Sequence, residues 1–332
     1  MCKFVMAGCL VLTLLSMVSP AWGDDQSAPK PGWLDVIKQP ATQPATSQPS
    51  IPGTGGVEKI GGPEPEWQKP IPLSVVVEYC LCSDYIFRGI NFSEYPGEGR
   101  ELPNNQLTTA FKYDLKEFGK VGATFWFEWF AGQEHLTPGQ GDLQEVDYTA
   151  YYQYTIDSIA TTLEAGYIEY TFPPLHGDAA NDSEVYLKGS WDDSKLWGTK
   201  APVLNPYLAW YQDVDLAEGA TWWEAGVSHD FALADMGQAD TPILKNIVVS
   251  PSVVLGAQHN YYGKLGVSPT QTTQLANVLY GLQVKYNLGQ ALNMPAKYGN
   301  IYIAPFVAYS EALDTDALKD WFYGGVKVGW EW

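Results

Sequence analysis

Apolar and polar residues alternate along most of the chain from residue 73 to residue 332. In the segment 121–130, Phe125 and Trp129 fall on one face of an extended strand, and Glu128 falls on the other. Similar alternation recurs in 146–156, 185–191, 223–227, 278–286, 301–309 and 322–332. A period of two over about ten residues is typical of β-strands with one apolar face.

The pattern predicts about twelve strands, beginning near Leu73, Gln106, Lys120, Glu145, Ala160, Ser183, Ala201, Thr221, Ile247, Gln274, Lys297 and Trp321. Many are near the ~9–11 residues that a tilted strand needs to cross a bilayer. We therefore expect an all-β fold, a transmembrane antiparallel up-and-down β-barrel over residues 73–332. Its apolar face would meet lipid, whereas a soluble sandwich, the alternative, would bury that face. An even strand count would place both ends of the barrel on the periplasmic side.

Charged residues occupy the second face of the predicted strands. We expect them to line the lumen; they are Glu78, Asp84, Lys112, Glu128, Glu164, Lys188, Glu224, Lys285 and Lys327. Arg88 joins this set, and its planar guanidinium could pair with a carboxylate such as Glu128 or Glu164. Two roles stay open for Arg88: a constriction charge that tunes ion selectivity, or a structural ion pair that closes the barrel.

Aromatic residues gather near the ends of the predicted strands, as in the girdles of membrane barrels. One rim would carry Trp129, Phe130, Tyr170, Phe172, Trp210, Tyr211, Trp222, Trp223, Tyr261 and Tyr262. The other would carry Trp191, Trp197, Tyr286, Tyr298, Trp330 and Trp332. The alternating last strand ends on Trp332, after Trp330. This ending resembles the C-terminal signature that the assembly machinery of outer-membrane barrels recognises, so that machinery and outer-membrane lipid are expected partners.

The N-terminal segments differ from the barrel. Residues 1–23 combine Lys3, an apolar stretch and a small-residue cleavage site, which predicts a signal peptide and export to the cell outer membrane. A lipoprotein signal at Cys9 is the alternative, but the apolar stretch before it is short. Residues 24–72 are rich in proline, which predicts a disordered periplasmic linker that could contact peptidoglycan or a periplasmic partner. No later apolar run is long enough for a transmembrane helix.

Charge excludes one class of function. The 332 residues carry 38 Asp and Glu against 19 Lys and Arg, a net charge of −19, which argues against nucleic-acid binding. The predicted outer connections, 93–105, 131–144, 173–182, 213–220, 260–273 and 310–320, are acidic. An acidic mouth concentrates cations. The pairs Asp213–Asp215 and Asp314–Asp316 could alternatively bind Ca²⁺ or be simply solvated.

Signatures of catalysis are sparse. His135, His176, His229 and His259 are scattered, and there is no nucleophile elbow, zinc-protease motif or phosphate-binding loop. Cys80 and Cys82 share a strand face but are poorly placed for an unstrained disulfide, and two thiols do not make a zinc site. They are expected to be lumen-facing fillers or a redox-labile pair. We predict no enzyme activity, cofactor or metal.

One stretch resembles a known family. Ser83, Tyr85, Phe87, Arg88, Gly89 and Ser93 match the hallmark of the TorF-like porin family, a Ser-x-Tyr-x-Phe-Arg-Gly stretch in the first strand with a Ser four residues past the Gly. The resemblance implies an exported, β-rich outer-membrane protein with pore formation as its activity. This chain departs from the family pattern by its Pro-rich segment before the barrel.

These features together predict a porin-like channel for passive diffusion of small solutes or ions, mildly selective for cations. Twelve strands suggest a lumen that is narrow or partly plugged. Two alternatives are a barrel enzyme acting at the outer face and a structural barrel whose arm, residues 24–72, contacts the cell wall.

Overall fold

The computed structural model describes residues 69–93, 103–130, 143–173, 175, 180–199, 201–238, 241, 243–268 and 273–332. The predicted signal peptide, residues 24–68 of the predicted linker, and parts of the predicted outer connections lie outside these residues. No helix in the described part of the chain is long and apolar enough to cross a membrane.

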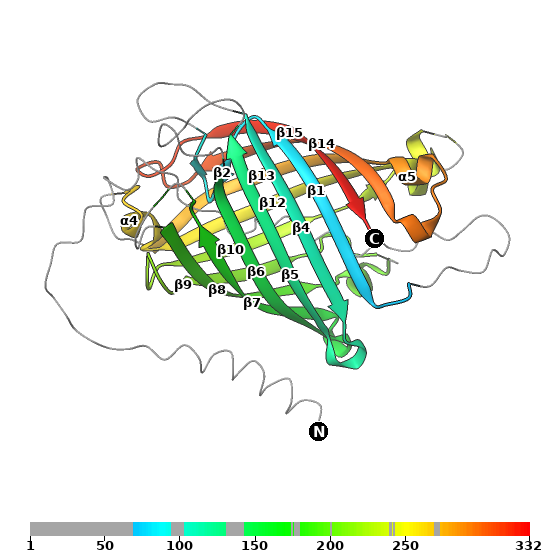
Figure 1. Ribbon diagram of the computed structural model, residues 1–332, viewed down its shortest axis with the longest axis horizontal. Coiled ribbons are helices and arrows are strands. Elements are labelled where there is room, and N and C mark those ends of the chain that lie inside the picture. The colour runs from blue at the N-terminus through cyan, green and yellow to red at the C-terminus, as the bar shows by residue number, and fades with distance from the viewer. Residues whose placement is uncertain are drawn as a thin grey trace, which may run out of the picture.

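Twelve antiparallel strands close into a barrel (Figure 1). They are β1 (Leu73–Cys82), β4 (Asn104–Asp114), β5 (Lys120–Phe130), β6 (Leu143–Ile156), β7 (Thr161–Thr171), β8 (Asn181–Trp191), β9 (Tyr207–Asp213), β10 (Thr221–Ser228), β12 (Ile247–His259), β13 (Thr273–Asn287), β14 (Asn300–Ala312) and β15 (Trp321–Glu331). Each strand pairs with its neighbour in sequence, β10 pairs with β12, and β15 returns to pair with β1. The predicted up-and-down barrel is confirmed.

Short strands, helices and turns lie between the barrel strands. They are β2 (Ile86–Phe87), β3 (Ile90–Asn91), β11 (Phe231–Ala232), α3 (Ser194–Trp197), α4 (Tyr261–Lys264), α5 (Leu288–Ala291), the 3₁₀ turns η1 (Lys116–Phe118), η2 (Asp157–Ile159), η5 (Leu244–Asn246) and η6 (Ala296–Tyr298), and the π-type turn η4 (Ala234–Gln238). Strand lengths are uneven: β13 has 15 residues, whereas β9 and β10 have 7 and 8. The strand predicted near Ala201 begins only at Tyr207, because a loop follows α3.

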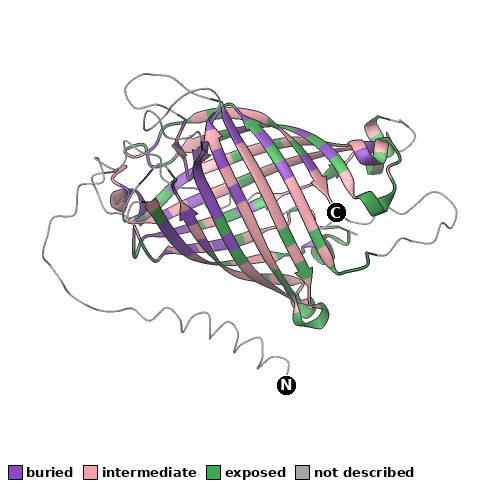
Figure 2. Ribbon diagram, in the orientation of Figure 1, coloured by how far each residue is buried: buried purple, intermediate pink, exposed green. Residues whose placement is uncertain are grey.

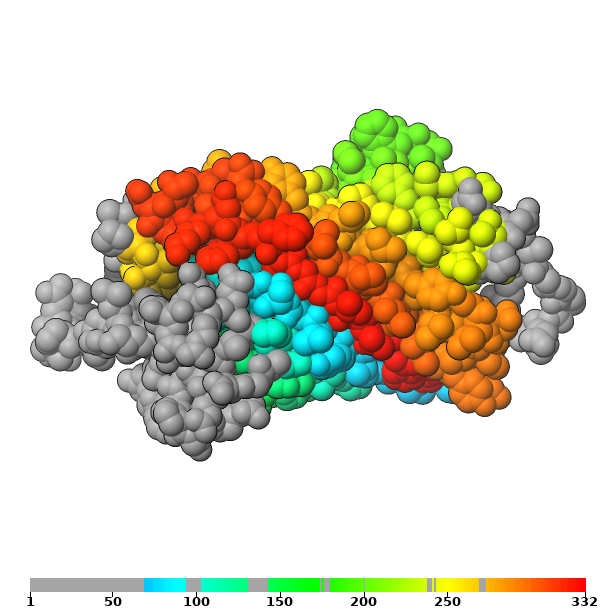
Figure 3. Space-filling view, turned by 90° about the horizontal axis from the view of Figure 1, so that it is seen from above, coloured from blue at the N-terminus to red at the C-terminus, as the bar shows by residue number. Residues whose placement is uncertain are grey.

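The seam of the barrel joins the two ends of the sheet. Strand β15 lies between β14 and β1 (Figure 3). Beyond the paired strands, the backbone of Val75 exchanges two hydrogen bonds of 2.7 and 2.8 Å with Trp332. The start of β1 and the end of β15 therefore lie at one rim, which we call the terminal end. The opposite rim, which carries α4, is the loop end (Figure 1).

The outer wall of the barrel is apolar. Exposed residues repeat every second position along the strands; among them are Tyr79, Leu81, Phe111, Val121, Tyr148, Leu163, Leu187, Leu208, Leu282, Val307, Val326 and Val328. The positions between them point inward, and Figure 2 shows their burial concentrated towards the loop end. The apolar face points outward, as predicted for a barrel in lipid and opposite to a soluble sandwich.

Strand β1 ends at Cys82, and the chain then turns inward. Residues 83–93 form what we call the inturned hairpin, in which β2 pairs with β3 as a separate two-stranded sheet. Its two-residue loop is Arg88 and Gly89, with φ of 46° and 82°. Two consecutive positive φ angles are typical of a type I′ turn, and Gly suits the second position. The expectation that these residues continue the first barrel strand is therefore wrong.

The loop end of the lumen is filled by a packed cluster. The inturned hairpin and α4 meet side chains from the wall, and the larger buried members are Tyr85, Phe87, Trp126, Tyr170, Phe172, Tyr186, Tyr211, Trp222, Tyr261 and Tyr262. Several of these residues were expected in the outer aromatic girdle at this rim. They lie inside because their strand positions alternate with lipid-facing ones: Trp222 is 2% exposed, whereas its neighbour Trp223 is 38% exposed.

Candidate functional site: a charged lumen closed at one end

The inturned hairpin is anchored by a buried ion pair. The two terminal nitrogens of Arg88 donate to the two carboxylate oxygens of Glu184 on β8, at 2.7 and 2.8 Å. Both side chains are almost fully buried. A two-pronged pair of this kind fixes orientation as well as position. The predicted partners Glu128 and Glu164 are wrong; Glu184, on the same face of its strand as Lys188, takes the role.

Aromatic rings surround the guanidinium of Arg88. Its central carbon lies 4.5–5.2 Å from the ring centres of Phe87, Tyr211, Trp222 and Tyr261. The rings come from the hairpin itself, from β9, from β10 and from α4. Cations over aromatic faces gain electrostatic stabilisation, most when water is excluded. The ring cage and Glu184 together form the site that we call the Arg88 latch.

Further hydrogen bonds hold the hairpin in the lumen. The hydroxyl of Tyr262 donates to the Arg88 carbonyl at 2.7 Å, and the hydroxyl of Tyr85 donates to Glu145 at 2.7 Å. Gly89 has no room for a side chain, since an added Cβ would lie 2.6 Å from a Leu318 methyl. The hairpin is therefore a fitted insert and not a loose loop.

The remaining motif residues stabilise the hairpin itself. Asp84 accepts hydrogen bonds from Ser83 Oγ at 2.6 Å and from Asn91 Nδ2 at 3.1 Å. Ser93 Oγ accepts the backbone N–H of Tyr85 at 2.8 Å. Asp84 thus belongs to the hairpin and not to the barrel wall, where it was expected. The family-like motif coincides with the insert that fills the lumen.

An acidic wall surrounds the hairpin. Six carboxylates of β5, β6, β8 and β9 are buried at this level: Glu128, Glu145, Asp147, Asp182, Glu184 and Asp213. Glu128 accepts a hydrogen bond from Asn104, and Tyr170 donates to Glu184 at 2.9 Å. Glu128 and Glu164 do not meet: Glu128 is paired in register with Glu145 instead.

The middle of the lumen carries the predicted charges as isolated contacts. Glu164 accepts the Tyr186 hydroxyl at 2.7 Å and faces Lys188 across the β7–β8 pair. Lys188 lies 4.5 Å from the Tyr207 ring centre, and Lys112 lies 6.0 Å from that of Tyr151. Separately, Glu224 accepts the indole N–H of Trp222 at 3.1 Å.

Nearer the terminal end, a second group of charged and polar residues spans four neighbouring strands, β13, β14, β15 and β1. Lys285 pairs with Glu331 at 2.5 Å, and Lys327 pairs with Glu78 at 3.2 Å. Tyr302 links the two pairs, since its hydroxyl donates to Glu78 at 2.5 Å while its ring centre lies 4.1 Å from the Lys285 ammonium. We call these five residues the charge ladder. The side chains of Lys285, Lys327 and Glu331 are partly buried, unlike the latch, whereas Glu78 is buried.

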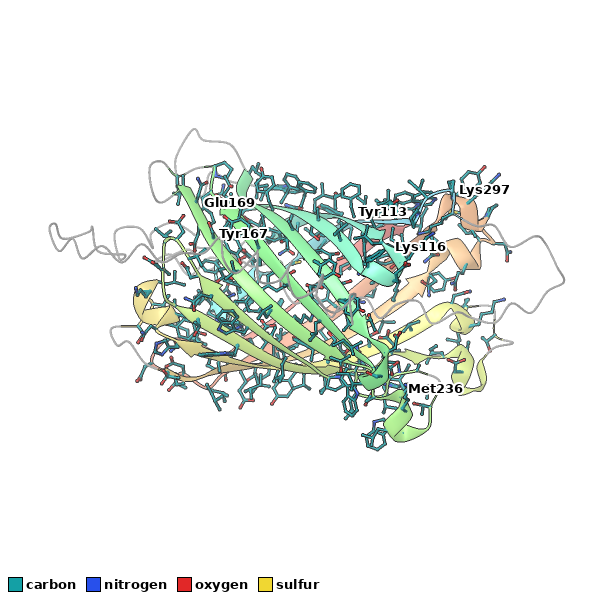
Figure 4. The ribbon with its side chains drawn as sticks, turned by 90° about the horizontal axis from the view of Figure 1, so that it is seen from below. Tyr113, Lys116, Tyr167, Glu169, Met236 and Lys297 are labelled. Carbon is teal, nitrogen blue, oxygen red and sulfur yellow. The ribbon has the colours of Figure 1, made fainter. Side chains whose placement is uncertain are left out.

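The rims differ in what they carry. In Figure 4, Lys116 and Lys297 lie at the terminal end, and Tyr167 and Glu169 lie at the loop end. Described acids of the loop end include Glu169, Asp182, Asp213, Asp215, Glu218, Glu311, Asp314, Asp316 and Asp320, against Lys264 and Lys319. Trp330 and Trp332 donate their indole N–H groups to the carbonyls of Tyr298 and Lys297, at 2.7 and 3.0 Å. Their role in assembly stays a prediction.

The Asp213–Asp215 pair and two of the histidines make contacts within the protein. Asp213 Oδ1 accepts the backbone N–H groups of Asp215 and Ala217, each at 3.0 Å, so it stabilises its own loop. Within the described residues, no group of three or more His, Cys, Asp or Glu could hold a metal ion. His229 and His259 contact Val203 O and Thr273 Oγ1, while His135 and His176 lie outside the described residues.

The solved structures that match this chain include two porins and one outer membrane channel. The "KdgM porin" is 11% identical over 77% of this chain and 98% of its own, with a TM-score of 0.40. The NanC porin is 13% identical over 78% and 98%, with a TM-score of 0.41. An outer membrane channel from Pseudomonas putida F1 is 9% identical over 82% and 100%, with a TM-score of 0.44. No family model and no curated protein matches the sequence.

Proposed function

We propose that this protein is an outer-membrane channel for passive diffusion of small solutes or ions, with a preference for cations. The observation that carries the proposal is the contrast between the two faces of one sheet. The outer wall is apolar, while the inner wall carries the charge ladder and the isolated charges of the middle layer. Partly buried ammonium and carboxylate groups need water around them, so the terminal half of the lumen is expected to be wet.

Selectivity is inferred from the acidic wall. A low-dielectric passage lined by one sign of charge raises the local concentration of the opposite ion. Once the inturned hairpin is displaced, water would reach the six buried carboxylates of the acidic wall and favour their charged form, and the described residues of the loop rim are also mainly acidic. Cations should therefore pass more readily than anions.

The inturned hairpin makes this a gated channel in our proposal. It fills the loop end in the latched arrangement, so conduction requires its displacement. Such a channel would show brief openings separated by long closed periods.

Single-channel recording in a planar bilayer tests the proposal. We expect openings whose reversal potential in a KCl gradient favours K⁺, and a smaller preference in a Glu128→Gln, Glu145→Gln variant. Glu117→Gln, in η1 at the terminal end, is the matched control and should leave selectivity unchanged. Silence of a correctly folded barrel, both with and without an intact latch, would refute the channel function.

A further inference from the structure

Two free thiols meet on the inner wall of β1. Cys80 and Cys82 are each 4% exposed and unoxidised, while Tyr79 and Leu81 on either side of Cys80 face outward. The side chains of Cys80 and Cys82 lie on the same face of β1 and are close enough to interact electrostatically. The pair lies immediately before the inturned hairpin begins. Two sulfurs are therefore presented side by side towards the lumen.

A cation stands next to this pair. Lys327 is the register partner of Cys80 across the β1–β15 seam. Its ammonium also contacts Glu78, two positions before Cys80 on the same face, at 3.2 Å. Lys327 thus belongs to the charge ladder and neighbours the thiols. A positive charge beside a thiol favours the thiolate, which is the form that binds metals.

We propose that Cys80 and Cys82 bind one soft monovalent metal cation, Cu(I) or Ag(I), in a two-coordinate site. Thiolate sulfur selects soft ions, and d¹⁰ monovalent ions accept two ligands in a roughly linear arrangement. Structural zinc needs four ligands, and the described residues supply no third His, Cys, Asp or Glu here. Alternate residues of one strand also make a poor disulfide, which keeps both sulfurs available.

The binding step balances in charge. Each thiol releases its proton to water as its sulfur bonds to the metal, so two protons leave for each ion bound. The resulting bis-thiolate complex has a net charge of −1 and lies beside the Lys327 ammonium, whose positive charge it shares with Glu78. No oxidant or reductant takes part. Metal binding is independent of the proposed channel function, since it is measured without conductance.

The test uses the folded full-length barrel in detergent, with Cys2→Ser and Cys9→Ser so that only the two lumen thiols remain. Ag⁺, which is inert to redox chemistry, is titrated and its stoichiometry measured by native mass spectrometry. Cu(I) is then titrated against a chromogenic chelator. We expect one ion per barrel and two protons released. Cys80→Ser and Cys82→Ser should each abolish stoichiometric binding.

Controls separate metal binding from folding. Resistance to SDS without heating verifies that each variant forms the barrel. Lys327→Gln should retain the stoichiometry but weaken the affinity by roughly 10-fold, as loss of a supporting group does. Zn²⁺ should bind far more weakly. Three results would overturn the proposal: no ion bound with both thiols free, a disulfide in the purified protein, or unchanged affinity in the single-Ser variants.

Discussion

If the inturned hairpin gates the proposed channel, replacing Arg88 by Ala should make a mostly closed channel open often. The change removes both hydrogen bonds to Glu184 and the contacts with four rings, and leaves a carboxylate buried beside Tyr170. Breaking a buried ion pair from one side costs about 3–5 kcal/mol. The barrel strands keep their own ladders, so we expect this cost to fall on docking of the inturned hairpin.

This free-energy cost sets how far the open probability should rise. At about 1.4 kcal/mol for each factor of ten, the undocked population should rise by roughly 100- to 4,000-fold. Single-channel recording measures the open fraction, and hydrogen exchange of the Tyr85 and Phe92 amides reports the loss of protection when the undocked hairpin is exposed to water and opens. These amides donate to Ser93 Oγ and to the Tyr85 carbonyl within the hairpin.

A second variant guards against loss of folding. In Arg88→Met, Glu184→Leu both charges are gone, and apolar replacement of a buried pair is often close to neutral, so docking should largely recover. Lys188→Ala removes a lumen cation that lies on the Tyr207 ring, and should leave open probability unchanged. The reasoning fails if Arg88→Ala forms the barrel yet opens and exchanges like the wild type. Failure of Arg88→Ala to form the barrel at all would instead support a purely structural role.

Two further predictions concern the wall and a turn. Val326→Arg places a charge in lipid and should lower the free energy of unfolding by about 2–4 kcal/mol in bilayer urea titrations; lumen-facing Gln283→Arg is its control and should cost far less. Asp193 accepts N–H groups of Leu204, Trp197, Val203 and Asn205, and although burial raises its pKa these bonds hold the pKa below the usual value. Its stabilisation is therefore complete above the ordinary Asp pKa of about 3.9 and lost as pH falls through the lowered value. Asp193→Ala should lower the free energy of the local opening that exposes the Val203 and Leu204 amides by about 1–3 kcal/mol at pH 7. Both amides should therefore exchange faster. The difference should shrink below about pH 4, and its growth there would contradict the assignment.

The barrel was predictable because its signal repeats. Every spanning strand must show an apolar side to lipid, so the period of two survives in each strand. Closure follows because an open sheet edge would leave backbone groups unpaired in lipid. The strand near Ala201 was misplaced because the loop after α3 also contains apolar residues, such as Val203 and Leu204, without the alternation of a wall.

The interior was harder to predict for a physical reason. The alternating pattern predicts which side chains face lipid and which face the lumen, but it does not predict what fills the lumen. The stretch 83–93 alternates like a strand, but the chain leaves the wall after Cys82 and reverses direction at Arg88 and Gly89, where both φ angles are positive. The latch partner could have been found from Lys188 by counting back four positions to Glu184, but choosing among six wall carboxylates requires the three-dimensional register.

At the short strands β9 and β10, the barrel wall spans a shorter distance across the membrane than elsewhere. A strand needs ~9–11 residues to cross the hydrocarbon layer, and these have 7 and 8. The membrane must meet this deficit by thinning locally, or the whole cylinder must lean until the low side fits. Lipids with shorter or more disordered tails would then gather along that flank, so membrane thickness would affect the tilt of the protein.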